Sequence, residues 1–357
     1  MRISWLQFLR AAAALLVLLG HTIGVANRLG GHERLQWPTG IGVDLFFAIS
    51  GFIMVYASDR LFTRQSAGRE FLIRRASRVV PLYWASTTAI LCLMVLGSRG
   101  WSGLPAFSYI ASSYLFVPSD AFGSVDGIAF PLLSLGWTLN YEMLFYAIFS
   151  VFLFLPRTRA IVCVAMVMLT VVLLGQLTVP ASIILSTWSQ PIILEFVLGM
   201  FIGEGFLRGV RLPRTVSVVM LGMAIIWIVL DPTGIVALRQ TPNDFTRLFG
   251  WGVPAVMVLA SFLLAPWRMP PMIEKPSLLL GDASYSLYLT HPFVLIILER
   301  AWPQLVGRKY LAVLVPVGVV LAIVLAVIVH RIAERPFDVA IKRLRSRSQL
   351  LSPAIGT

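Results

Sequence analysis

The stretch that decides the fold is FLRAAAALLVLLGHTIG, residues 8–24. It is apolar enough to belong to a membrane-spanning helix, which needs about 20 such residues, yet it contains Arg10 and His21. On an α-helix eleven residues turn through about 1100°, so Arg10 and His21 share one face and lie about 16 Å apart along the axis. The spacing therefore predicts a helix with a cation near one membrane surface and an imidazole in the opposite half of the bilayer.

The rest of the chain has the same apolar character. Of its 357 residues, 58% are hydrophobic and only 13% are charged, and the mean hydropathy is +0.85, whereas soluble proteins contain roughly a quarter charged residues. We therefore predict an all-α integral membrane protein with about ten transmembrane helices. The predicted spans are residues 8–28, 40–57, 80–97, 131–155, 160–178, 183–207, 213–230, 246–266, 280–299 and 310–331.

The positive charge is distributed unevenly between the two sides of this arrangement. The formal net charge is +13. If the N-terminus is cytoplasmic, twenty-one Lys and Arg residues lie in cytoplasmic segments and eight lie outside. This bias follows the positive-inside rule and predicts that both termini are cytoplasmic. The positive net charge is then explained by the orientation of the chain in the membrane, and no nucleic-acid partner is expected.

The sequence predicts one transmembrane domain, residues 1–335, followed by a basic and poorly ordered cytoplasmic tail, residues 336–357. The longest outer segment, residues 98–130, is rich in Gly, Ser, Pro and aromatic residues. It is expected to form a partly buried lid or a short interfacial helix.

Ionisable residues inside a membrane span are costly, and they usually face a bundle interior or a water-filled cavity. Arg10 and His21 allow two interpretations, a functional stripe on one helix face or a surface anchor with a packed core histidine. Asp44, in GVDLFFAISGFIM at residues 42–54, lies at the predicted outer mouth of the second span. It either orients an imidazole or begins a helix as a dipole-stabilised carboxylate.

Two further polar motifs follow along the chain. FLIRRASRVVPLYW, residues 71–84, places Arg75 and Arg78 on one helical face. These arginines either bind the phosphates of a nucleotide cofactor or a lipid headgroup, or serve topology alone. SLGWTLNYEMLFY, residues 134–146, carries Trp137 and Glu142. A buried glutamate must form an ion pair, be protonated or contact water. Glu142 is therefore either a functional carboxylate or a structural partner of an arginine or histidine.

The last polar motif is LGDASYSLYLTHPFV, residues 280–294. Ser284 and His291 are seven residues apart and lie on nearly one helical face, with Tyr288 between them. Pro292 is expected to interrupt this span, and the alternative interpretation of His291 is a packing residue at that kink. His32 and His330 are assigned no role. The histidines and cysteines have no zinc-ligand spacing, so no metal is expected.

Taken in order, these motifs resemble those of the acyltransferase-3 family of membrane acyltransferases, and the resemblance covers nearly the whole chain. The matching positions are Arg10 with His21, the FFxxSGF run from Phe46 to Phe52, Arg75 and Arg78 before Pro81 and Tyr83, Trp137 to Glu142, Ser284 to His291, and Arg335 with Pro336. The opening segment looks most like members that decorate exopolysaccharides of the succinoglycan type.

The resemblance implies an O-acyltransferase that moves an acetyl group from cytoplasmic acetyl-CoA to a hydroxyl group of an exported or lipid-linked bacterial polysaccharide. It implies that His21 is the general base and that Asp44 or Glu142 orients it. Residues expected to bind the CoA phosphates are Arg10, Arg75 and Arg78. Residues expected to contribute to substrate binding are Trp137, Ser284, Tyr288 and His291.

The implied setting is the bacterial inner membrane. Expected partners are the polysaccharide or lipid-linked oligosaccharide acceptor, membrane lipids, and the polysaccharide polymerisation or export machinery. Two rival functions fit the same composition. A polytopic transporter or flippase suits many spans with buried charges, although the sequence contains no inverted repeat. A non-catalytic scaffold of a secretion complex is the other rival, and it would tolerate loss of His21.

Overall fold

The computed structural model describes residues 3–30, 37–97, 104–119, 129–178, 182–237, 244–307, 310–337 and 339. Within these ranges the regular structure is helical and no strand occurs. Parts of three sequence predictions lie outside the described residues. They are His32, residues 98–103 and 120–128 of the outer segment, and residues 340–357 of the tail.

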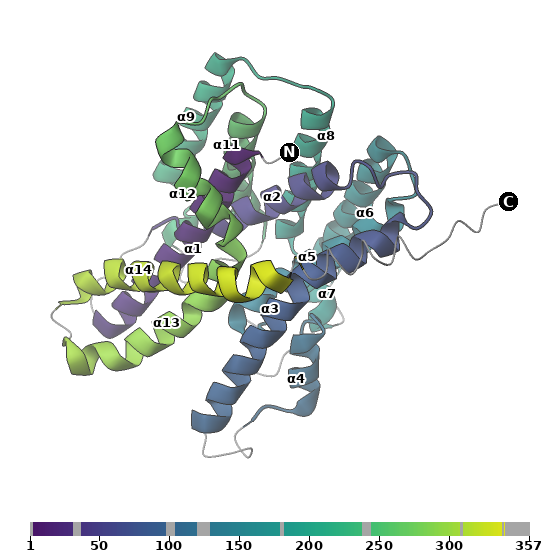
Figure 1. Ribbon diagram of the computed structural model, residues 1–357. Coiled ribbons are helices and arrows are strands. Elements are labelled where there is room, and N and C mark those ends of the chain that lie inside the picture. The colour runs from purple at the N-terminus through teal and green to yellow at the C-terminus, as the bar shows by residue number, and fades with distance from the viewer. Residues whose placement is uncertain are drawn as a thin grey trace.

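Every predicted apolar stretch falls on one or more α-helices (Figure 1). The helices are α1 (Ser4–Gly30), α2 (Ile41–Ala57), α3 (Ala67–Gly97), α4 (Phe107–Tyr114), α5 (Trp137–Phe152), α6 (Arg157–Leu177), α7 (Ile183–Trp188), α8 (Leu194–Leu207), α9 (Arg214–Leu230), α10 (Phe245–Arg247), α11 (Val253–Leu263), α12 (Pro271–Asp282), α13 (Ser284–Leu305) and α14 (Leu311–Val329). Two π-helices, Leu248–Gly252 and His330–Glu334, join α10 to α11 and extend α14.

Five helical segments of the described chain are long and apolar enough to cross a membrane. They are Ser4–Gly30, Ala67–Gly97, Arg157–Leu177, Phe245–Leu263 and Leu311–Phe337. Two shorter helices, α2 and α9, are also apolar. The predicted class, an all-α membrane protein, is therefore confirmed. The count of ten spans and the cytoplasmic position of both termini stay predictions.

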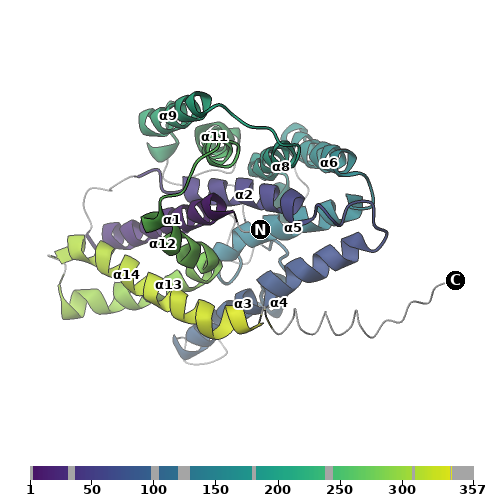
Figure 2. The same ribbon diagram turned by 45° about the horizontal axis from the view of Figure 1, so that its top comes forward.

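Helix α1 lies at the centre of one half of the bundle, where it packs against α2, α12, α13 and α14 (Figure 2). Helix α13 runs parallel to α1, because residues pair in the same order along both helices. Arg10 bonds to Ser284 near the start of α13, and Arg28 pairs with Glu299 further along. The first helix therefore carries its polar stripe against α13.

Helix α2 runs antiparallel to α1, and its first turn lies near the middle of α1. A Cβ atom on Gly42 would lie 2.5 Å from the carbonyl oxygen of Ala13, while Thr39 lies against Gly20. Small residues permit this close approach between helices. Asp44 lies in this first turn of α2 and is fully buried.

The packing of α2 against α8 also depends on glycine. A Cβ atom on Gly51 would lie 2.0 Å from the carbonyl oxygen of Phe196, and one on Gly199 would lie 2.0 Å from that of Ala48. These distances are far below van der Waals contact, so a side chain at either position would force the helices apart. The close packing holds Phe46, Phe47 and the rest of the α2 face in a fixed position.

The predicted interruption at Pro292 is wrong. Helix α13 is continuous from Ser284 to Leu305, and the break in this region falls earlier, at Ala283 between α12 and α13. Proline removes one main-chain hydrogen bond, which membrane helices tolerate when neighbouring helices support them. Here α13 is supported by α1 on one side and α14 on another.

Candidate active site

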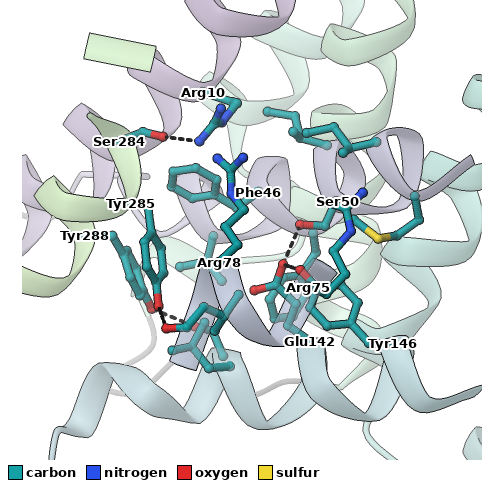
Figure 3. Close-up of a pocket in the computed structure, with 18 residues that line it drawn as sticks. Arg10, Phe46, Ser50, Arg75, Arg78, Glu142, Tyr146, Ser284, Tyr285 and Tyr288 are labelled. Carbon is teal, nitrogen blue, oxygen red and sulfur yellow. Dashed lines mark hydrogen bonds between the residues drawn. The ribbon is translucent and has the colours of Figure 1, made fainter. Parts of the chain in front are cut away.

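A cavity of about 130 Å³ lies between α1, α2, α3, α5 and α13 (Figure 3). It joins most of the polar motifs found in the sequence. The labelled residues of its wall are Arg10, Phe46, Ser50, Arg75, Arg78, Glu142, Tyr146, Ser284, Tyr285 and Tyr288. Five segments that are distant in the sequence therefore converge on one polar cavity inside an apolar bundle.

Arg10 reaches this cavity from α1. Its Nη2 donates to Ser284 Oγ at 2.9 Å, and its Nη1 donates to Gln7 Oε1 at 3.2 Å. Ser284 Oγ in turn donates to the carbonyl oxygen of Gly281 at 2.8 Å. Both side-chain partners of Arg10 are neutral, and they fix the direction of its guanidinium group.

Arg75 and Arg78 enter from α3, three residues apart on one face. The guanidinium of Arg75 lies over the ring of Phe71 at 5.5 Å, and Figure 3 shows those of Arg78 and Arg10 pointing toward one another. Among the described residues, none of these three arginines forms an ion pair. Arg74, on the outer face of the same helix, instead pairs with Glu70.

Glu142 on α5 supplies the carboxylate of the cavity wall. Its Oε1 accepts hydrogen bonds from Ser50 Oγ at 3.2 Å and from the hydroxyl group of Tyr146. The wall thus holds three guanidinium groups against one carboxylate. In an apolar surrounding this excess of positive charge attracts an anion, and guanidinium forks match phosphate oxygens.

Tyr288 marks the end of the cavity nearest to the histidines. Its hydroxyl group bonds with Thr138 Oγ1 at 2.8 Å and donates to the carbonyl oxygen of Leu135 at 3.0 Å. The centroid of its ring lies 6.4 Å from that of His291. Tyr288 therefore connects the cavity wall to the histidines of α1 and α13.

His21 and His291 form a pair whose ring centroids lie 5.1 Å apart. His21 Nδ1 donates to the carbonyl oxygen of Val17, and His291 Nδ1 donates to that of Leu287, both at 2.9 Å. Because a carbonyl oxygen only accepts, each neutral ring carries its hydrogen on Nδ1 and a lone pair on Nε2. His21 is solvent-accessible, whereas His291 is buried and its Nε2 has no partner among the described residues.

The structure gives Asp44 a different partner from the one predicted. Both of its carboxylate oxygens accept hydrogen bonds from Arg247 at 2.9 Å, and both side chains are almost fully buried. The Arg247 guanidinium lies 5.8 Å from the ring of Trp137 and 5.4 Å from that of Trp251. Asp44 and Trp137 thus belong to a closed ion-pair cluster.

The orienting partner of His21 is a further correction to the sequence analysis. Within the described chain, neither Asp44 nor Glu142 forms a hydrogen bond with His21, and the carbonyl of Val17 takes that place. The cavity joins six of the predicted site residues, namely Arg10, Arg75, Arg78, Glu142, Ser284 and Tyr288. His21 and His291 lie together beyond Tyr288 and do not line that cavity in the described structure.

Sequence reasoning missed two members of the ion-pair cluster. Arg247, at the start of the predicted span 246–266, was assigned no role, yet it is only 3% exposed. Glu195, on α8, is fully buried, and its carboxyl group lies close to the Asp44 carboxylate and the Arg247 guanidinium. A carboxylate inside a predicted span was the available signal for Glu195.

The described residues contain no group of three or more His, Cys, Asp or Glu side chains arranged to hold a metal ion. The cavity combines three guanidinium groups with an apolar wall, which suits an anion that carries an apolar arm. The histidine pair lies beyond Tyr288.

Fold and cavity together define a helical membrane protein with a cation-lined internal site. The chain belongs to the acyltransferase-3 family, because residues 3–331 match that family's acyltransferase domain. The predicted enzyme class, an acyltransferase, is confirmed by this membership.

Two relatives illustrate the family. The chain is 35% identical over 260 residues to the exopolysaccharide production protein ExoZ of Rhizobium meliloti (strain 1021), covering 73% of this chain and 78% of that protein. It is 27% identical over 315 residues to a Komagataeibacter xylinus protein named "Putative membrane-bound transacylase BcsY", covering 81% of this chain and 72% of that protein. No solved structure matches the chain.

Proposed function

We propose that this protein is a membrane O-acyltransferase that moves an acetyl group from acetyl-CoA to a hydroxyl group of an exported or lipid-linked bacterial polysaccharide. The observation that carries the proposal is the cavity with three arginines and one carboxylate, whose wall reaches a histidine pair through Tyr288. Family membership supports acyl transfer. The relative ExoZ is an exopolysaccharide production protein, which supports a polysaccharide acceptor.

The donor binds through its phosphates. Arg75, Arg78 and Arg10 present guanidinium groups that no carboxylate neutralises by an ion pair within the described chain, and each can bind phosphate oxygens through two parallel hydrogen bonds. The apolar wall formed by Phe46 and its neighbours suits the pantetheine arm. The thioester at the end of this arm then lies toward Tyr288 and the histidines.

His21 is the general base. Its Nδ1–H bond to Val17 fixes the ring orientation and leaves the Nε2 lone pair available. The acceptor hydroxyl attacks the carbonyl carbon of the thioester, and its proton passes to Nε2. The carbon–sulfur bond of the tetrahedral intermediate then breaks, and the proton passes from His21 to the departing thiolate. The products are an acetyl ester and CoA.

The remaining predicted site residues have supporting roles in the proposed reaction. Ser284 fixes Arg10, and Glu142 holds Ser50 and Tyr146 at the wall of the donor cavity. Tyr288 separates the donor cavity from the histidines, and the acyl group must pass it. His291 lies buried beside His21 on the acceptor side of the site, where it supports the ring of the general base. Trp137 supports the Asp44–Arg247 pair.

The membrane setting is part of the same proposal. We propose that the protein lies in the bacterial inner membrane with both termini in the cytoplasm, so that Arg10, Arg75 and Arg78 meet cytoplasmic acetyl-CoA. His21 lies about 16 Å further along α1 and is accessible, which suits an acceptor handled at the outer face. Interaction with polysaccharide polymerisation or export machinery is part of this proposal.

The proposal is tested by removing the gene and measuring both the amount of exported polysaccharide and its ester content by NMR. We expect polysaccharide that is exported in normal amount but lacks one acetyl ester, and restoration of the ester by the wild-type chain. Loss of export with esters intact on the residual polymer would identify a transporter. Unchanged ester content would end the proposal.

A further inference from the structure

The donor cavity is too small for a whole acyl-CoA. Its volume is about 130 Å³, whereas pockets for ligands of drug size measure about 300–1,000 Å³. It has room for part of the donor only, with the phosphates favoured at its arginines and the thioester arm at its apolar wall. The nucleoside end of the donor therefore needs a second site that opens from the arginines.

A second cavity, of about 120 Å³, begins at Arg78. It lies between α3 and the C-terminal π-helix His330–Glu334. The lining residues used in the argument are Arg78, Leu82, Ala85, Ala333, Glu334 and Phe337. Arg78 is the residue that lines both cavities, so a ligand whose phosphates bind Arg78 has room on both sides of it.

The chemistry of this second cavity suits a purine base. Leu82 and Phe337 provide apolar contact for a flat ring, and aromatic side chains commonly stack on bases. Glu334 is only 8% exposed. Its Oε2 accepts from Ser286 Oγ at 2.5 Å and from His330 Nδ1 at 2.9 Å, which fixes the carboxylate at the cavity wall. Among the described residues no hydrogen bond reaches Oε1, which can accept from the amino group of adenine.

We propose that the adenosine end of the acyl donor binds in this second cavity, with its base against Phe337 and its amino group directed to Glu334. The inference rests on the proposed use of acetyl-CoA. The donor then straddles Arg78: its arm enters the first cavity, and its nucleoside lies between α3 and the π-helix. Recognition of the nucleoside is thereby separated from the site of chemistry.

Two donors distinguish this arrangement from its alternatives. Acetyl-CoA contains the nucleoside, whereas S-acetyl-phosphopantetheine has the same thioester arm and one phosphate but no nucleoside. Ala85→Trp fills the second cavity from α3, and Ala333→Trp fills it from the π-helix. Ala89→Trp is the matched control, because Ala89 is exposed one turn further along α3 and lies outside the cavity lining.

We expect Ala85→Trp and Ala333→Trp to raise the KM for acetyl-CoA roughly tenfold, since base stacking typically contributes about that much. The KM for S-acetyl-phosphopantetheine should stay unchanged, and Ala89→Trp should change neither. An equal effect on both donors, or no effect on either, would overturn the inference and would mean that the groove supports the fold or takes a lipid. If the wild-type protein uses neither donor, the proposed function fails as well.

Discussion

The protein contains two groups of buried charged side chains, and they differ in whether the charges are paired with each other. In one, Asp44 and Arg247 bind each other through two hydrogen bonds of 2.9 Å, and Arg247 lies near Trp137 and Trp251. In the other, Arg10, Arg75 and Arg78 line a cavity without an ion pair in the described chain. The first group is closed to ligands, and the second is open to one.

We expect the paired charges to stabilise the fold and the unpaired arginines to bind a ligand. Removing one partner of a buried ion pair leaves an uncompensated charge, which is strongly destabilising. An arginine that already lacks a carboxylate partner costs the fold little when it is replaced, and its loss weakens ligand binding. Substitutions can therefore show whether a charged residue stabilises the fold or binds a ligand.

The largest expected effect is on catalysis by His21. His21→Ala removes the proposed general base, and the rate of acetyl transfer should fall about 10²–10⁴-fold. The thermal unfolding midpoint in detergent should stay close to that of the wild type, because the side chain is accessible. Arg211→Ala is the control, since Arg211 is exposed and lines neither the donor cavity nor the second cavity. Full acetylation by His21→Ala would remove His21 from the mechanism.

The next effect concerns the closed pair. Arg247→Ala should destabilise the protein by about 3–5 kcal/mol, because Asp44 then remains buried without its cation. The double variant Asp44→Leu/Arg247→Met replaces both charges by apolar groups and should recover much of this loss. Unfolding in detergent measures both. Equal stability of Arg247→Ala and the wild type would contradict a structural role for the pair.

The open arginines should show the reverse behaviour. The double variant Arg75→Ala/Arg78→Ala should weaken acetyl-CoA binding at least about tenfold, because each charge-assisted hydrogen bond contributes about 1.5–3 kcal/mol. Its unfolding midpoint should change little. Arg74→Ala is the matched control, since Arg74 is on the same helix but pairs with Glu70. Unchanged affinity of the double variant for acetyl-CoA would show that these arginines only set the orientation of the chain in the membrane.

The smallest expected effect is at the exposed end of α1. Arg28 pairs with Glu299 at 2.7 Å, and its side chain is 60% exposed. Exposed ion pairs contribute at most about 1 kcal/mol, so Arg28→Ala should change stability by less than that. Unfolding in low and high salt measures this contribution. A loss of stability comparable with that of Arg247→Ala would show that solvent exposure does not determine how much these ion pairs stabilise the protein.

The all-helical membrane class is the part that sequence reasoning predicted and the structure confirmed. Apolar runs of about 20 residues identify spanning helices with few competing interpretations, and the run at 8–28 became α1. The spacing of Arg10 and His21, and that of Arg75 and Arg78, places each pair on one face through helix geometry alone. These are local properties of the chain.

The partners of the buried carboxylates were not predictable in the same way. Asp44 and Arg247 are 203 residues apart in the sequence, and no local pattern relates them. The continuity of α13 through Pro292 likewise depends on support from α1 and α14. Tertiary packing decides which polar residues pair with each other and which line the cavity. The order of the motifs along the sequence does not reveal this.

The central claim is that donor and acceptor reach the active site from opposite sides of the membrane, the donor at the arginines and the acceptor at His21. The direct test uses sealed vesicles that contain the protein, with labelled acetyl-CoA inside and an impermeant polysaccharide acceptor outside. We predict labelled ester on the external acceptor, and none with His21→Ala. Ester that forms only when donor and acceptor share one compartment would contradict the claim.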